Sequence, residues 1–256
     1  MDLQLSDAQF ERLTRNFPLP KGCPTCGDAK RYRLDGEWHE CNCIDQRALA
    51  KRYFAANIPR RFHQLDGTDF DAEYRKQNDG VVEVVDNYLT KFKYNYHYGL
   101  GLCFYGPLGT GKTLLATHVL RQTLKLGFSG YFIQFKDLFH AWAASWKDDE
   151  SKEEVETFMK RSQVLVLDEI RTDPRNKEGF LQDGLEAIMR HRYNNNLPTI
   201  LTTNMRESEL RDEFPRPYSL ISGVTTWLTM DGADYRPLSL QNAEYLVEHE
   251  ETLPVK

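Results

Sequence analysis

The chain has 256 residues, of which 40% are hydrophobic and 28% are charged, and its formal net charge is −5. This length accommodates one domain of ordinary size and a small additional module. No apolar run approaches the roughly 18 to 20 residues that cross a bilayer, and the acidic N-terminus lacks the pattern of a signal peptide. We therefore expect a cytoplasmic protein with no membrane partner. The negative charge also argues against a uniform nucleic-acid-binding surface, although it is compatible with local basic patches.

The N-terminal part combines a short predicted helix with a dense group of cysteines. Residues 1–20 have the apolar spacing of a helix. Four of the five cysteines follow as a C-x-x-C pair and a C-x-C pair, fourteen residues apart. In a reducing compartment such pairs favour a metal over a disulfide. Four thiolates can converge on one tetrahedral Zn²⁺, which predicts zinc ligands at Cys23, Cys26, Cys41 and Cys43.

Two alternatives to this four-cysteine site remain open. His39 could replace one cysteine, because a C-x-C pair spans a tighter loop than C-x-x-C. A redox-active C-x-x-C pair would normally begin a helix in a βαβ unit, and the sequence lacks that context here. Two extended pieces, 30–34 and 37–41, flank a turn between the pairs and favour a zinc ribbon or knuckle.

A module this small cannot bury enough apolar surface to fold alone, so bound metal would supply much of its folding energy. A predicted helix over residues 45–57 follows it. The module could contact nucleic acid or dock on a protein, since aromatic and basic side chains suit both. These side chains are Arg31, Tyr32, Arg33, Trp38, Lys51, Arg52 and Tyr53.

Beyond residue 60, short apolar runs alternate with amphipathic helical stretches. This pattern predicts an α/β domain with a parallel sheet that is covered on both faces. Cys103 lies within the first run and is expected to be an ordinary core residue. The predicted strands are residues 100–106, 130–135, 162–170 and 197–204.

A phosphate-binding loop follows the first of these strands. Residues 106–113 fit G-x-x-x-x-G-K-[ST], and a predicted helix over 114–127 comes next, so strand and helix are placed as the motif requires. Backbone N–H groups and the helix N-terminus would hold the phosphates of ATP, and Lys112 would reach their oxygens. Thr113 would bind Mg²⁺. The predicted nucleotide-binding residues are Gly106, Pro107, Leu108, Gly109, Thr110, Gly111, Lys112, Thr113 and Leu114.

Two later strands end in polar residues that suit ATP hydrolysis. Asp168 and Glu169 follow four apolar residues, at the edge where parallel sheets bind ligands. Asp168 would hold Mg²⁺ through water, and Glu169 would activate the attacking water. Asn204 ends the next strand and could sense the γ-phosphate. Taken singly, the acidic pair could be a solvated turn or helix cap, and Asn204 a turn residue.

Together these motifs resemble an AAA+ ATPase, and further segments resemble its DnaC/IstB-like branch of helicase loaders and transposition helpers. These segments are 55–71, which leads into the core, 191–204, and 214–236. The resemblance covers roughly residues 50–237 and implies an α/β parallel-sheet P-loop ATPase core without a separate lid domain. The cysteine module is similar to the zinc-binding N-terminal domain of DnaI-type loaders. The implied organisation is a zinc-binding, partner-docking module at 1–60, the AAA+ core at 61–239 and an acidic tail at 240–256.

The resemblance also implies roles for three arginines. Arg216 falls where the family places an arginine finger that completes a neighbouring subunit's ATP site, with Arg211 as its nearest competitor. Arg236 falls near the family's second sensor. Segment 171–184 departs from the commonest loader pattern, whereas the short tail after Arg236 is typical of the loader branch.

The function implied is ATP-dependent loading of a hexameric replicative helicase onto single-stranded DNA. ATP, Mg²⁺ and Zn²⁺ would be the cofactors, and like subunits would share ATP sites. Two alternatives are an IstB-type helper that acts with a transposase on duplex DNA and a nucleotide-binding adaptor with negligible hydrolysis. Leu138, Trp142 and Trp146 share a helix face near the family's DNA contacts, but packing on the sheet is the favoured interpretation.

Overall fold

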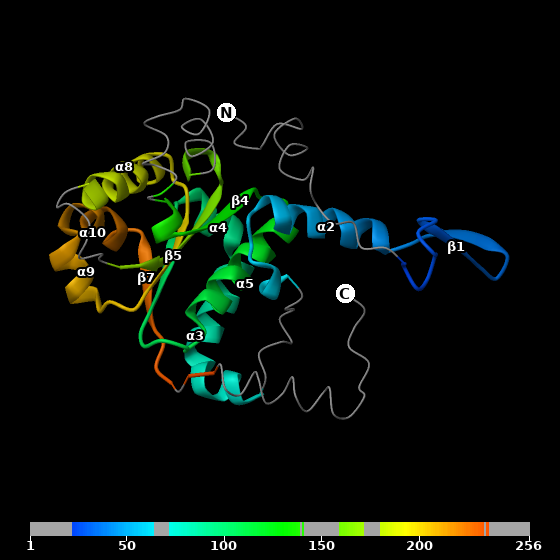
Figure 1. Ribbon diagram of the computed structural model, residues 1–256, viewed down its shortest axis with the longest axis horizontal. Coiled ribbons are helices and arrows are strands. Elements are labelled where there is room, and N and C mark those ends of the chain that lie inside the picture. Colours follow the sequence, from blue (N-terminus) through cyan, green and yellow to red (C-terminus); the bar gives the residue numbers. More distant parts are fainter. Residues whose placement is uncertain are drawn as a thin grey trace.

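The computed structural model describes residues 22–63, 72–138, 140, 159–171, 180–232 and 234–235. At its centre is a five-stranded sheet of order β4-β5-β6-β3-β7, in which every neighbouring pair is parallel (Figure 1). This architecture confirms the predicted α/β parallel sheet and adds a fifth strand at its edge. The strands are β3 (Gly101–Tyr105), β4 (Gly130–Gln134), β5 (Val164–Ile170), β6 (Thr199–Thr203) and β7 (Thr225–Thr229).

β3 and β5 contain continuous apolar runs because the two faces of each strand pack on different cores. Leu102 and Phe104 of β3 point into one cluster, whereas Cys103 between them points into the other. β5 shows the same alternation, with Val164 and Val166 on the first side. Since side chains alternate along a strand, burial on both faces leaves no polar position in its middle. Cys103 is thus a core residue, as predicted.

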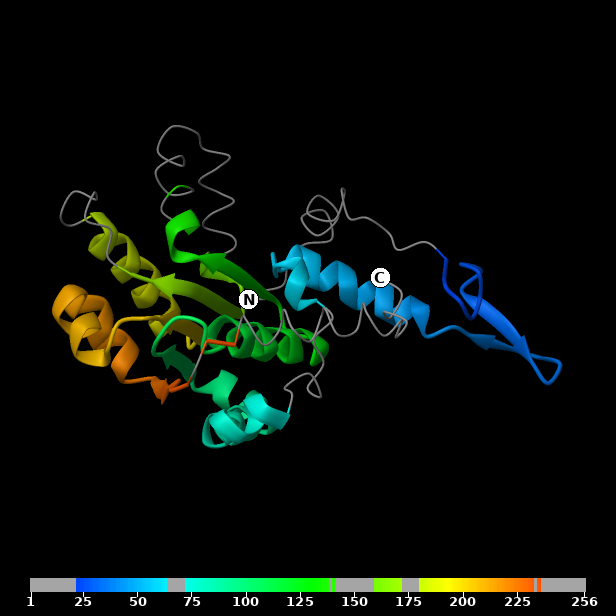
Figure 2. The same ribbon diagram turned by 60° about the horizontal axis from the view of Figure 1, so that its bottom comes forward.

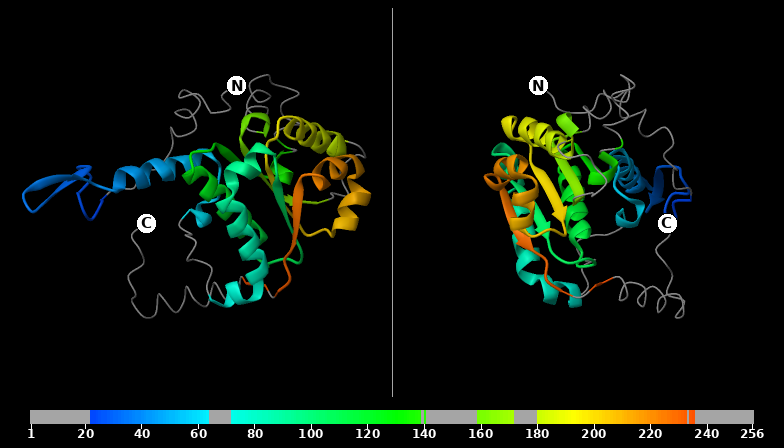
Figure 3. Two further views of the ribbon diagram at one scale, coloured as in Figure 1. Left: turned by 180° about the vertical axis from the view of Figure 1, so that it is seen from behind. Right: turned by 60° about the vertical axis from the view of Figure 1, so that its left-hand side comes forward.

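Helices cover both faces of the sheet. One face packs against α3 (Ala72–Thr90), α5 (Lys112–Lys125) and the end of α2 (Cys43–Ala55). The other packs against α8 (Phe180–Asn194), α9 (Glu207–Glu213) and α10 (Pro215–Ser222). Figure 3 shows α8 and α10 across the sheet from α2. Two further short helices are η1 (Arg60–Phe62) and α4 (Phe92–His97).

An antiparallel hairpin forms the N-terminal module. Its strands β1 (Arg31–Leu34) and β2 (Glu37–Glu40) are joined at Asp35 and Gly36, whose φ values are 51° and 91°. Positive φ at both central residues is what a two-residue hairpin turn requires, and Asp-Gly supplies it at low cost. Figures 1 and 2 show the hairpin at the end of α2 that points away from the sheet.

The other end of α2 belongs to the core. Tyr53, Ala56 and Ile58 are buried in the cluster beneath α5. Arg52 donates to the carbonyl of Leu124 at 3.2 Å, and Phe132 N–H donates to the carbonyl of Ala56 at 2.8 Å. The helix therefore connects the hairpin to the core that surrounds the sheet, and the division near residue 60 remains a prediction.

Several predicted features lie outside the described residues: the helix at 1–20, Trp142, Trp146, Arg236 and the tail 240–256. Leu138 is described and fully buried, in agreement with packing on the sheet. Among the residues that the structure describes, no helix is both long and apolar enough to cross a membrane.

Candidate functional site

The loop between β3 and α5 has the backbone of a phosphate cradle. Gly106, Gly109 and Gly111 have φ values of 143°, 78° and 89°. These conformations are costly for residues that carry a Cβ and open to glycine. α5 then begins at Lys112, so its unpaired N-terminal N–H groups face the loop.

Lys112 folds back over this loop. Its side chain is buried, and its Nζ donates to the carbonyls of Gly106, at 2.7 Å, and of Pro107. A phosphate could draw the ammonium from these neutral carbonyls, because charged acceptors make stronger hydrogen bonds. Thr110 is buried, whereas Leu108 is exposed. The side chain of Leu114 packs against the core beneath the helix, so only its backbone faces the loop.

Thr113 and Asp168 meet at the head of α5. The Thr113 hydroxyl donates to Asp168 Oδ1 at 2.9 Å, and the Thr202 hydroxyl donates to the same oxygen at 2.6 Å. Asp168 is 2% exposed, and burial raises the pKa of its carboxyl above the usual value. A hydroxyl and a carboxylate in this position could hold Mg²⁺, which takes hard oxygen ligands.

Glu169 occupies a strained position beside Asp168. Its φ is +57°, and the register between β5 and β6 shifts between Leu167 and Ile170. The Glu169 N–H donates to the Thr202 hydroxyl at 2.8 Å, so a single threonine holds both acidic residues. A bulge of this kind redirects a side chain, and it is retained where the surroundings stabilise it.

Thr202 has no signal in the sequence that would have singled it out. It lies within the uninterrupted strand β6, and only the pairing of β5 with β6 brings it to the acidic pair. Asn204, by contrast, follows β6 directly and is exposed, at the same sheet edge as Asp168.

Tyr74, Asp234 and Tyr235 lie against the phosphate loop and were not predicted. Tyr235 N–H donates to the carbonyl of Gly109 at 3.1 Å, and its ring meets that of Tyr74 edge-on with centroids 5.0 Å apart. A Cβ at Gly111 would come within 2.6 Å of the Tyr74 hydroxyl. Two segments that are distant in the sequence thus support the outer side of the loop.

Arg216 lies in the first turn of α10, which packs on the face of the sheet opposite to α5. Its side chain is 75% exposed and lies 3.6 Å from Glu186 of α8. Glu186 also accepts from Arg190, and this hydrogen bond keeps the pKa of the carboxyl below its usual value. Arg211 is exposed too and pairs with Asp212. Exposed ion pairs contribute little stability, so either arginine could turn toward another subunit.

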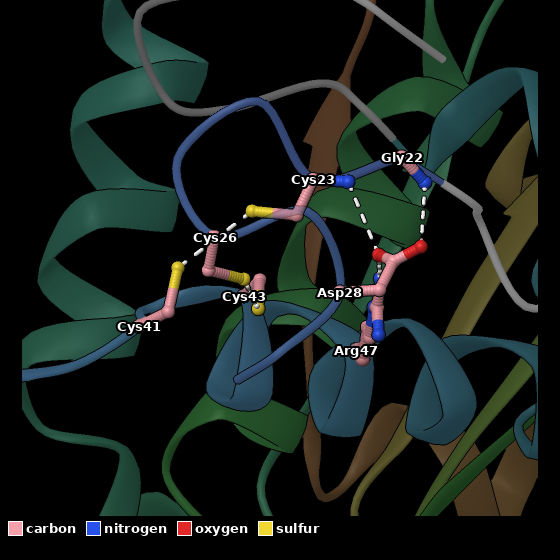
Figure 4. Close-up of polar contacts among 7 residues, drawn as sticks. All are labelled: Gly22, Cys23, Cys26, Asp28, Cys41, Cys43 and Arg47. Carbon is pink, nitrogen blue, oxygen red and sulfur yellow. Dashed lines mark hydrogen bonds and ion pairs between the residues drawn. The ribbon is translucent and has the colours of Figure 1, made fainter. Parts of the chain in front are cut away.

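The four predicted cysteine ligands converge on one point (Figure 4). All four Sγ atoms lie within 4.8 Å of one another, and the Cys23–Cys41 and Cys26–Cys43 sulfurs are 3.6 and 3.5 Å apart. Sulfurs around a tetrahedral zinc with bonds of about 2.3 Å are separated by about 3.8 Å. The arrangement therefore fits a metal such as zinc.

Other groups near the cysteines have different roles. His39 is exposed and stacks on Tyr32 with ring centroids 5.7 Å apart. Backbone N–H groups of Cys26 and Thr25 lower the pKa of Cys23 to about 6, which favours the thiolate that a metal binds. Burial instead raises the pKa of Cys43 to about 12, and a metal ion would have to displace its proton.

Asp28 fixes the first cysteine pair and was also not predicted. Its carboxylate accepts from the backbone N–H groups of Gly22 and Cys23, at 2.9 and 3.1 Å, and pairs with Arg47 of α2 (Figure 4). These interactions lower the pKa of Asp28 to about 2. The Asp that follows C-x-x-C-G was the available signal, since such side chains often hydrogen-bond nearby backbone.

Residues 39–216 match the model of the family described as IstB-like ATP binding protein. The chain belongs to this family. It is 21% identical over 234 residues to the replicative helicase loader DnaI of Bacillus subtilis (strain 168), covering 84% of this chain and 74% of DnaI. It is 29% identical over 143 residues to the insertion sequence IS5376 putative ATP-binding protein of Geobacillus stearothermophilus, covering 55% of this chain and 52% of that protein.

Solved structures agree with this membership. The DnaC helicase loader structure has 25% identity and a TM-score of 0.54, covering 62% of this chain and 99% of that one. A DnaI structure has 20% identity and a TM-score of 0.54, covering 70% and 94%. An AMPPCP-bound DnaA from Aquifex aeolicus has 21% identity and a TM-score of 0.52, covering 70% and 54%. The family member is thus an ATP-binding AAA+ ATPase with a cysteine cluster in front of its core.

Proposed function

We propose that this protein is an ATP-dependent loader that delivers a hexameric replicative helicase onto single-stranded DNA. The cysteine module joined to the ATPase core is the observation that carries this proposal. The similarity to DnaI covers 84% of the chain. Residues 61–256 make up a smaller share of the chain than this, so the similarity must extend into the N-terminal module at 1–60. The similarity to the insertion-sequence protein covers only 55%.

In this proposal the phosphate loop holds ATP, and Lys112 contacts the phosphate oxygens. Thr113 and Asp168 hold Mg²⁺, which would neutralise phosphate charge when bound. Glu169 accepts a proton from the attacking water, and Asn204 orients that water or the γ-phosphate. The strained backbone at Glu169 supports this role, because it redirects the carboxylate away from the regular strand.

Arg216 would complete the ATP site of a neighbouring subunit, and Arg236 would contact the nucleotide within its own subunit. The exposure of Arg216 and its weak pairing with Glu186 support its availability to a second copy. A guanidinium supplied to the γ-phosphate stabilises charge in the transition state. ATP hydrolysis would therefore depend on the assembly of like subunits. Hydrolysis in the assembled state would then time the release of the helicase.

The cysteine module, with zinc bound to Cys23, Cys26, Cys41 and Cys43, would dock on the helicase. The hairpin carries Trp38 and Leu34, which are 62% and 52% exposed. Exposed aromatic and aliphatic side chains on a rigid hairpin are suited to anchor a protein interface. The helix α2 would transmit this docking to the ATPase core, in which its C-terminal end is buried.

Affinity purification from the native cell, with ATP and the Glu169→Gln variant, tests the proposal. The variant should bind ATP without hydrolysing it and so retain its partner. We expect the replicative helicase, and its loss when Trp38→Ala and Leu34→Ala are combined. Recovery of a transposase in its place would favour the helper function suggested by the insertion-sequence relative. Failure of the wild-type chain to hydrolyse ATP with every captured partner would favour the nucleotide-binding adaptor.

A further inference from the structure

The described segments at the edge of the sheet opposite the phosphate loop contain no carboxylate. Parallel topology collects there the five segments that precede the strands, hereafter the N-terminal edge. These segments contain seven lysines and arginines and no Asp or Glu, although the whole chain has 38 acidic and 33 basic residues. In sheet order, the N-terminal edge consists of residues 125–129, 159–163, 190–198, 91–100 and 222–224.

Hydrogen bonds and ring contacts join these segments into one surface. Val164 N–H donates to the carbonyl of Ser129 at 3.0 Å, and Gly101 N–H donates to that of Val224 at 2.8 Å. Gln163 Nε2 donates to the Tyr96 hydroxyl at 3.2 Å. The rings of Tyr96 and Phe128 are 4.9 Å apart. The charges of the five segments therefore act together, because neighbouring segments are in direct contact.

Three exposed tyrosines lie on this surface. Tyr94, Tyr98 and Tyr193 are 60%, 51% and 47% exposed. Tyr94 and Tyr98 are one turn apart, with ring centroids separated by 4.7 Å. Tyr98 and Tyr193 line the same cavity of about 370 Å³, which lies between the residues before β3, the end of α8 and the end of α10. All three side chains are therefore accessible to solvent at this edge, and two of them pack against each other.

Exposed basic side chains lie in the same and in the neighbouring segments. Lys91, Lys93 and His97 are exposed on either side of Tyr94, and Arg161 is exposed on the neighbouring segment. Among the described residues outside the strands, the acidic groups that precede these segments most closely in sequence are Asp86, which is exposed in α3, and Glu186, which accepts from Arg190 at 2.5 Å. Both belong to helices that lead toward the edge, and neither lies in its five segments.

Arg192 adds a buried positive charge beneath this surface. Its guanidinium donates to Thr199 Oγ1 and to the carbonyls of Met159 and Pro198, at 2.9, 2.9 and 2.7 Å. Burial lowers its pKa to about 9, so it stays largely protonated at neutral pH. Neutral oxygens satisfy its donors without cancelling its charge, which contributes to a positive potential at the edge.

We propose that the N-terminal edge binds single-stranded DNA, with bases stacked on Tyr94, Tyr98 and Tyr193 and phosphates paired with Lys91, Lys93 and Arg161. Five described segments with seven basic and no acidic residues are complementary to a polyanion, and exposed aromatic rings between basic side chains are how proteins bind unpaired bases. Duplex DNA has no free base faces for the rings. The choice of DNA as the polymer rests on the proposed loader function.

Binding at this edge would leave the ATP site free. The five residues of β3 separate the edge from the phosphate loop by about 16 Å at roughly 3.3 Å per residue. A loader could therefore hold the strand on one side of the sheet and ATP on the other. It also follows that substitutions at the edge should not alter ATP affinity.

Fluorescence anisotropy of the full chain with labelled oligothymidylate and a non-hydrolysable ATP analogue tests this inference. Tyr94→Ala combined with Tyr98→Ala should weaken binding at least about tenfold, whereas the Tyr94→Phe, Tyr98→Phe pair should bind as wild type. Lys91→Glu combined with Lys93→Glu should weaken binding and reduce the slope against log salt by about 1.4. The matched pair Arg31→Glu, Arg33→Glu on the hairpin should leave binding unchanged.

Two outcomes would overturn the inference. One is wild-type affinity in both the alanine and the glutamate pairs, with normal ATP binding and thermal stability. The other is loss of binding only in the hairpin pair, which would place the DNA on the module. Helicase capture measured in parallel separates this inference from the loader function. If the chain captures helicase but the edge variants bind DNA as wild type does, the inference about the edge is refuted and the loader function stands. If the edge binds DNA but the chain captures no helicase, the loader function is refuted and the inference about the edge stands.

Discussion

The cysteine module and the ATPase core are held together by different means. β1 and β2 are exposed along almost their whole length, and β2 contains no buried residue. β3 and β5 are almost entirely buried between two apolar clusters. The hairpin depends on four converging sulfurs and on Asp28, whereas the core depends on removing apolar surface from water.

This difference teaches that the two regions can be perturbed separately, even though α2 joins them. A metal-dependent module folds only when its ligands are deprotonated and bound. A core that is buried on both faces of its sheet needs no such ligand. Each prediction below changes one of the two regions.

Removal of the metal should have the largest effect. We expect one zinc per chain by elemental analysis, and none in the Cys41→Ser, Cys43→Ser double variant. Because metal binding in such sites provides about 10 kcal/mol or more, hydrogen exchange over residues 22–42 should become that of an unfolded chain. Exchange in β3 and β5 should not change.

His39→Ala is the matched control for this experiment, since His39 stacks on Tyr32 outside the sulfur cluster. It should keep its zinc. Zinc retained by the double cysteine variant would contradict the four-thiolate site, and zinc lost from His39→Ala would show that the histidine is a ligand.

Arg216→Ala should reduce assembly-stimulated hydrolysis by about a thousandfold or more, as removal of an arginine finger does. ATP affinity and thermal stability should stay unchanged, because the pair with Glu186 is exposed. Mixing this variant with Glu169→Gln should restore part of the activity at sites shared between the two. Arg211→Ala serves as the matched control. Loss of activity in Arg211→Ala alone would transfer the role to that residue.

Lys112→Ala should weaken ATP binding about tenfold to hundredfold, the usual effect of losing a charged hydrogen bond. Zinc content and hydrogen exchange of the hairpin should remain those of the wild type. Lys136→Ala removes an exposed lysine and provides the control by isothermal calorimetry. Equal ATP affinity in the two variants would exclude the phosphate-loop role of Lys112.

Asp168→Asn should slightly raise the stability of the protein without nucleotide. The amide keeps an acceptor for Thr113 and Thr202 but removes a buried charge, so Tm of the nucleotide-free protein should rise. Mg²⁺-dependent hydrolysis should fall in the same variant. A lower Tm in calorimetry would show that the charge, rather than the hydrogen bonds, stabilises the empty site.

Much of the fold could be predicted because burial on both faces leaves a plain signal. β3 and β5 contain continuous apolar runs, and the phosphate loop and the cysteine pairs are local patterns with fixed spacing. Such features can be recognised from the amino-acid sequence alone. Their confirmed parts are the parallel sheet and the convergence of the four cysteines.

The rest depends on contacts between distant segments. Thr202 reaches Asp168 only through the pairing of β5 with β6, and Tyr74 reaches the phosphate loop from a separate helix. The positive φ of Glu169 accompanies a register shift between β5 and β6, and no residue type in the sequence predicts that shift. The basic edge likewise comes from five segments that are individually unremarkable in charge and are collected only by the sheet order.

Delivery of helicase to a closed circular single strand tests the central claim most directly, because a closed strand has no end onto which a ring could thread. The helicase retained on the circle would be counted with the wild-type chain and ATP, and with Lys112→Ala. The loader function predicts retention with the wild type alone, and its loss on chelation of the metal. Equal retention without the chain, or with Lys112→Ala, would contradict it.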